Sequence, residues 1–169
     1  MIESSPRWVA LALAAALTAS PVLHAAAQTG APVVPAATWD ILLKKIEKEG
    51  VPVKGYDGKS AKGRVGPPDA AHTDFTATSA YDFDGVADVV ADVTLIVVKF
   101  SPTGKAGEFK AQLWNIILGR TGKVIAAHSE EHIGSSATGY RKLSSLSLNE
   151  GDPAVKARLD EALQYWTTR

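Results

Sequence analysis

Apolar residues recur at helical spacing in two segments, and these segments flank a long stretch in which apolar and polar positions alternate. Residues 39–49 place four apolar side chains three or four positions apart: Trp39, Leu42, Leu43 and Ile46. This spacing predicts an amphipathic helix, with Thr38 as its N-cap and Gly50 as its terminator.

A second helix is predicted near the end of the chain. Asp152 is a good N-cap residue, and Pro153 directly after it suits the first helical position because that position needs no free N–H. The apolar stripe that follows consists of Val155, Leu159, Leu163 and Trp166. Both predicted helices therefore have one face to bury.

Between the helices, the apolar positions follow the two-residue period of β-strands. The pattern predicts four strands, at residues 74–83, 89–100, 109–118 and 123–128. A fifth strand is suggested at residues 140–148, and residues 51–71, rich in Gly, Pro and Lys, offer an edge strand at residues 51–55 or 62–65. Short connections favour an antiparallel meander. We therefore predict an α+β domain, with an N-terminal and a C-terminal helix on one face of a four- to five-stranded antiparallel meander. This layout is similar to that of cystatin-like and cone folds.

The first 27 residues have the order of a secretory signal. Arg7 precedes an uncharged apolar run at residues 8–17, and residues 25–27 are all Ala, which suits a signal peptidase. The run is shorter than the roughly 20 residues that a membrane span needs. We predict cleavage after Ala27, a flexible tether at residues 28–37 and a single α+β domain at residues 38–169. The protein is expected to be periplasmic or secreted.

Charge and cysteine content exclude several classes of function. The chain has 18 basic and 18 acidic residues, and removal of the predicted signal takes away one Glu and one Arg, so the balance persists. Without a basic excess, a nucleic-acid partner is not expected. The chain has no cysteine, which excludes disulfides, thiol nucleophiles and cysteine metal ligands.

Residues 128–132 read His-Ser-Glu-Glu-His and match the H-x-x-E-H pattern of a class of zinc peptidases. That chemistry requires a helix, whereas these residues follow a predicted hairpin strand. On a strand, His128 and His132 still share one face, and His72 could supply a third imidazole for zinc. The alternative is that His128 is an ordinary partly buried strand residue and His132 lies at an exposed strand end.

The sequence also contains a candidate calcium loop, formed by Asp82, Asp84 and Asp88 in the string DFDGVADVV. The string resembles the calcium loops of FG-GAP propeller repeats, which implies carboxylate ligands for calcium. It lacks the central Asp-Gly pair of that pattern and occurs once. The alternative is a hairpin turn in which Asp and Gly supply the turn geometry.

The hairpin after residue 118 defines a candidate ligand-binding site. If Thr121 and Gly122 are the central residues of a tight turn, Leu118 lies opposite Ile125 and Asn115 lies opposite His128. Asn115 and His128 then share an otherwise apolar face with Ile117, Val124 and Ala126. This polar pair is a candidate binding group, and Trp114 is a further candidate. The alternative is an ordinary cross-strand hydrogen bond, with Trp114 in the core.

Two of the predicted strands are apolar on both faces, and such surface must be covered by the protein's own helices, a second copy or a ligand. The residues concerned are Ile96, Val98, Phe100, Trp114, Ile116 and Leu118. No nucleophile motif such as G-x-S-x-G occurs. We therefore predict a non-enzymatic binding domain for a partner protein or a small apolar ligand, with a homodimer as one option. The alternative is a small zinc- or calcium-dependent protein or enzyme centred on His128 and His132 or on residues 82–88.

Overall fold

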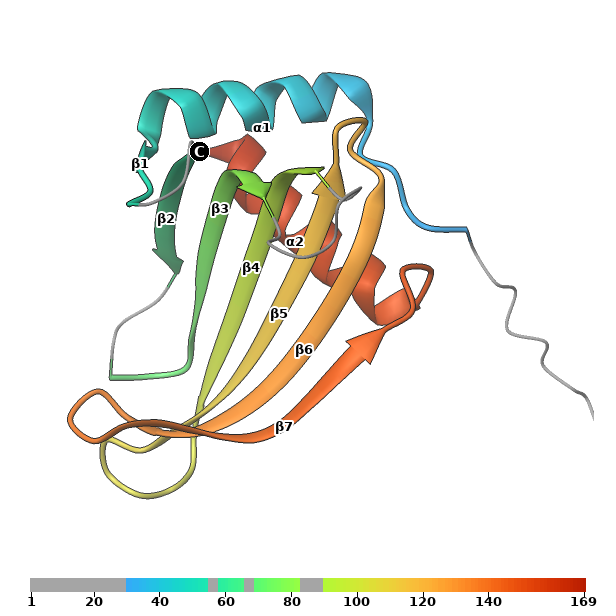
Figure 1. Cartoon of the computed structure of the whole chain (residues 1–169). Helices are drawn as coiled ribbons and strands as arrows, with labels where there is room; N and C mark the ends of the chain where they lie inside the picture. Colours follow the sequence, from blue (N-terminus) through green and yellow to red (C-terminus); the bar gives the residue numbers. More distant parts are fainter. Residues whose placement is uncertain (1–29, 55–57, 66–68, 83–89) are drawn as a thin grey trace, which may run out of the picture.

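The computed structural model describes residues 30–54, 58–65, 69–82 and 90–169, which form one antiparallel sheet and two helices (Figure 1). The elements in chain order are α1 (Ala36–Glu49), β1 (Val51–Pro52), β2 (Lys59–Val65), β3 (His72–Asp82), β4 (Val90–Pro102), β5 (Phe109–Gly119), β6 (Val124–Ser135), β7 (Gly139–Leu148) and α2 (Pro153–Thr168). The sheet has seven strands in sequence order. The α+β class and the antiparallel sheet are confirmed. The expected four to five strands are too few, and the cystatin-like layout is not matched exactly.

Residues 51–71 contain two strands, β1 and β2, where the prediction offers a single edge strand at residues 51–55 or 62–65. In β2, the cations Lys62 and Arg64 alternate with Ala61 and Gly63. This alternation carries little hydrophobic signal, because the inward positions hold small residues rather than large apolar ones. The small residue is needed at one of them, since a Cβ on Gly63 would lie 1.6 Å from the Tyr165 hydroxyl of α2.

Both helices pack on the same face of the sheet. α2 crosses it and contacts β4 and β5, while α1 lies along one end, against α2, β2 and β3 (Figure 1). The core between these layers includes Trp39, Leu42, Ile46, Phe75, Val93, Leu95, Val97, Ile116, Leu118, Leu159 and Trp166. The apolar stripes of the two helices thus meet the inward residues of the central strands.

The start of α2 agrees with the prediction, whereas the start of α1 does not. Asp152 caps α2 as predicted, and its carboxylate accepts a hydrogen bond from the Ala154 amide at 2.7 Å. By contrast, α1 begins at Ala36, so Thr38 is helical and is not the N-cap. The cause lies in the preceding segment: Val34 is buried, and its amide donates to the Gly122 carbonyl at 3.0 Å. The residues directly before α1 are therefore held against the β5–β6 turn by this hydrogen bond.

The β5–β6 hairpin has the predicted pairing in its middle but not near its turn. Asn115 lies opposite His128, as predicted. Leu118 pairs with Val124 rather than with Ile125, because the register shifts between the middle of the hairpin and its turn. Val124 is consequently buried in the core and does not share the face of His128.

One end of the sheet curls strongly away from the helices. Phe100 on β4 and Tyr140 on β7 have ring centroids 5.7 Å apart, although β5 and β6 lie between their strands. In a flat sheet, strands three steps apart are separated by about 14 Å. The start of β7 therefore folds over the sheet at this end, as Figure 1 shows.

Candidate functional site

The face of the sheet opposite the helices is here named the open face. Side-chain alternation and the strand register assign to it Lys62, Arg64, His72, Asp74, Thr76, Ile96, Val98, Phe100, Leu113, Asn115, Ile117, His128, Glu130, His132, Lys142 and Ser145. These residues change along the strand order from mainly polar and charged on β2 and β3, through mainly apolar on β4 and β5, to polar and charged on β6 and β7. The open face is therefore an apolar surface with two polar borders.

The apolar strip at its centre consists of Ile96, Val98, Phe100, Leu113 and Ile117. All five are partly buried, although both described helices pack on the other face. The curl of the sheet contributes to this burial, and at the curled end it leaves Ala111 only 4% exposed. The apolar strip thus lies on a concave surface.

Glu130 is the centre of an ion-pair cluster on β6 and β7. Its Oε2 accepts a hydrogen bond from His132 Nε2 at 2.8 Å, and its Oε1 lies 3.3 Å from His128 Nε2. Lys142 on β7 donates to Oε1 at 2.5 Å. Ser145 Oγ lies 3.0 Å from His128 Nε2 and 3.5 Å from Glu130 Oε1. The cluster therefore ties β6 to β7 through side chains as well as through the backbone.

These donors lower the pKa of Glu130 from 4.5 to about 2. The hydrogen bond from Lys142 contributes most, and those from His132 and His128 add to it, whereas partial burial acts in the opposite direction. Glu130 is consequently ionised at neutral pH. A group held as a carboxylate accepts hydrogen bonds but has no proton to give as a general acid.

The geometry around His128 differs from that of a hydrolase relay. In a Ser–His–acid triad, the hydroxyl and the acid bind opposite nitrogens of the imidazole. Here Ser145 Oγ and Glu130 Oε1 both approach Nε2 of His128. Among the residues that the structure describes, no group of three or more His, Asp or Glu side chains is placed to hold a metal ion. The arrangement supports a link between strands rather than a reacting group.

The other predicted site residues do not gather at one place. Asn115 shares the open face with His128, as predicted. Trp114 lies on the helix side, where the Arg158 guanidinium carbon is 5.9 Å from its ring centroid, so it does not line a site with Asn115. The predicted calcium loop is formed by Asp82, Asp84 and Asp88. Asp84 and Asp88 lie outside the described residues, and so does the side chain of Asp82.

His72 lies in an aromatic setting at the curled end. Its ring stacks on Phe100, with centroids 4.6 Å apart and planes at 16°. Its Nδ1 is 2.9 Å from the Ala70 carbonyl, which can only accept, so Nδ1 carries the proton. Its Nε2 is buried without a hydrogen-bond partner in the described part of the chain, 3.8 Å from Asp74 Oδ1. The described side chains do not assemble the predicted group of three imidazoles.

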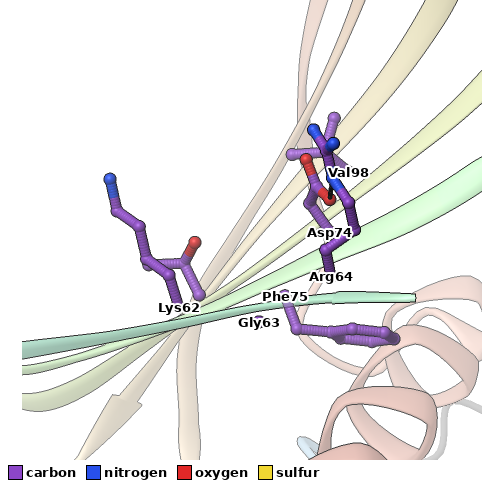
Figure 2. A pocket seen from close by; sticks show the side chains of 7 residues that line it. Lys62, Gly63, Arg64, Asp74, Phe75 and Val98 are labelled. Carbon is purple, nitrogen blue, oxygen red and sulfur yellow. Dashed lines mark hydrogen bonds and ion pairs between the residues drawn. The ribbon is translucent and has the colours of Figure 1, made fainter. Parts of the chain in front are cut away.

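A basic pocket that sequence reasoning missed lies at the β2–β3 border of the open face. Figure 2 shows Lys62 and Arg64 on the same side of β2, while Phe75 points to the opposite side. Arg64 Nε donates to Asp74 Oδ1 at 2.9 Å. The depression between these side chains and Val98 has a volume of about 440 Å³. The sequence signal for this pocket is a pair of cations two positions apart. The signal can be interpreted only when β2 is known to be a strand, because residues two positions apart then share one face.

Comparisons with known proteins add no functional residue. No protein-family model matches the chain, and neither the curated proteins nor the solved structures gave a match. Within the described residues, no helix has both the length and the apolar character needed to span a membrane. The geometry of the open face is therefore the basis for a functional proposal.

Proposed function

We propose that the protein is an exported, non-enzymatic binding domain whose open face binds a small apolar ligand. The observation that carries this proposal is the apolar strip, which lies on a concave sheet surface away from the packed core. Apolar surface outside the core commonly marks an interaction site. The polar borders on either side supply groups that could orient a ligand, as the few polar groups of most binding sites do.

The curvature of the open face favours a small ligand over a partner protein that would need a flat interface. The contact between Phe100 and Tyr140 shows that the β7 border of the open face bends over the apolar strip at one end. A bound ligand would then be touched by side chains from several strands at once. Burial of most of a ligand's surface is typical of small-molecule sites.

Fluorescence titration with the neutral apolar probe N-phenyl-1-naphthylamine tests this proposal. Val98→Asn adds a polar group to the apolar strip and is expected to weaken probe binding about tenfold, because it removes part of the apolar contact area. The matched control is Leu146→Asn on β7, where the leucine is 59% exposed. Absence of probe binding, or equal binding by both variants, would contradict the proposal. A dimer in which the open face is covered would favour a second copy instead.

Export is tested separately, because it rests on the sequence of the first 27 residues alone. Protein recovered from the periplasm or the medium is expected to begin at Gln28 or within two residues of it. N-terminal sequencing that finds Met1 in the exported pool would contradict cleavage.

A further inference from the structure

We infer that the ligand of the open face is an amphiphile with an anionic head group, which Lys62 and Arg64 bind while its apolar body lies on the apolar strip. This inference rests on the proposed function and specifies the ligand class. Its basis is the position of the basic pocket, which opens beside Val98 at the border of the apolar strip (Figure 2).

Arg64 is held in a position suited to an anion. Its Nε donates to Asp74 Oδ1 at 2.9 Å, and the side chain is still 48% exposed. A guanidinium anchored through Nε keeps further N–H groups on its outer edge, and these form the fork that matches carboxylate and phosphate oxygens. Asp74 thus orients the guanidinium and leaves part of it for a ligand.

Lys62 supplies a second cation on the same side of β2. It lines the same depression, and the described residues give it no ion-pair partner. Among the described residues, Asp74 is the only acidic one that lines the pocket. Two cations and one carboxylate leave a net charge of +1, which is complementary to one anionic head group.

The register connects this charge directly to apolar surface. Asp74 lies opposite Val98, and Thr76 lies opposite Ile96, so β3 alone separates the cations from the apolar strip. Two strand spacings amount to about 10 Å, which a short alkyl chain can span. One molecule with an anionic head and an apolar body would therefore satisfy both surfaces.

Isothermal titration calorimetry with dodecanoate, dodecan-1-ol and acetate tests the inference on the intact protein. Dodecanoate is expected to bind about tenfold more tightly than the alcohol, because only the carboxylate gains charge-assisted hydrogen bonds. Lys62→Gln and Arg64→Gln should each weaken dodecanoate binding about tenfold and leave alcohol binding unchanged. The matched control, Lys123→Gln, removes an exposed cation directly before β6 and should change neither.

The outcomes separate this inference from the proposed function. If dodecanoate and dodecan-1-ol bind equally well, or if the Lys62 and Arg64 variants behave as the control does, the anionic head group is wrong and the apolar site stands. If acetate binds as tightly as dodecanoate, the pocket is an anion site that does not use the apolar strip. If neither long-chain compound binds, the proposed function fails as well.

Discussion

Glu130 contacts both His128 and His132, which lie two positions before and after it on β6. One carboxylate oxygen accepts a hydrogen bond from His132 Nε2, and the other lies close to His128 Nε2. Side chains two positions apart on a strand point to the same face, so one carboxylate can meet both neighbours. Lys142 then adds a third donor from β7. The H-x-x-E-H string lies on a strand rather than on a helix, and there Glu130 links its two histidines to β7.

Replacement of this carboxylate should destabilise the β6–β7 pair. Glu130→Gln is expected to lower the melting temperature near neutral pH. The folded-state pKa of about 2 lies below the ordinary 4.5, so the stabilisation is fully present above about pH 4.5 and is lost as the pH falls through about 2. Melting curves of the wild type and the variant should therefore converge toward pH 2. Glu49→Gln, at an exposed position on α1, is the control, and a gap that widens on acidification would contradict the assignment.

The two adjacent leucines of α1 should respond differently to truncation. Leu42 is fully buried in the core, whereas Leu43 is only partly buried. Leu42→Ala is expected to cost about 2–5 kcal/mol of unfolding free energy, as large-to-small core substitutions do. Leu43→Ala should cost clearly less. Chemical denaturation of both variants measures the difference, and equal losses would place the helix in another rotation on the sheet.

Local signals explain which parts of the fold the sequence predicts well. The start of α2 is correct because Asp152 and Pro153 act within one helical turn. The pairing of Asn115 with His128 is correct because a short hairpin limits the possible registers. β2 is predicted only as one of two options for an edge strand, because its inward side chains are small and the partner of Gly63 is Tyr165, which lies far along the chain.

The candidate sites show the same limit. The sequence singles out His128 and His132, but their neighbour Lys142 comes from β7, and the register there shifts between Glu131 and His132. A bulge of this kind is not encoded in the alternation of either strand. The pocket of Lys62 and Arg64 is missed for a related reason, because a cation pair becomes a site only when β2 is placed beside β3 and Val98.

The close approach of β2 and α2 at Gly63 should be sensitive to a single methyl group. A Cβ there would meet the Tyr165 hydroxyl at 1.6 Å, and the Tyr165 ring is fixed by stacking on Phe75 at 4.2 Å. Gly63→Ala is expected to cost about 1–3 kcal/mol, as overpacking does. Tyr165→Ala removes the obstacle, so the double variant should lose less stability than the sum of the single variants. Additive losses would show that the two residues are not in contact.

Zinc is expected to leave the melting temperature unchanged, because the described residues place no three His, Asp or Glu side chains together to hold a metal ion. His132 Nε2 lies 2.8 Å from Glu130 Oε2, and His128 Nε2 lies 3.0 Å from Ser145 Oγ. A zinc ion bound to these two Nε2 atoms, at about 2.0–2.1 Å, would have to break both contacts. Since a ligand that binds only the folded state raises its stability by mass action, thermal unfolding with and without excess zinc detects binding at any site. A rise in melting temperature that His132→Gln abolishes would support the metal-site hypothesis at this residue, and a rise that persists in this variant would locate zinc elsewhere.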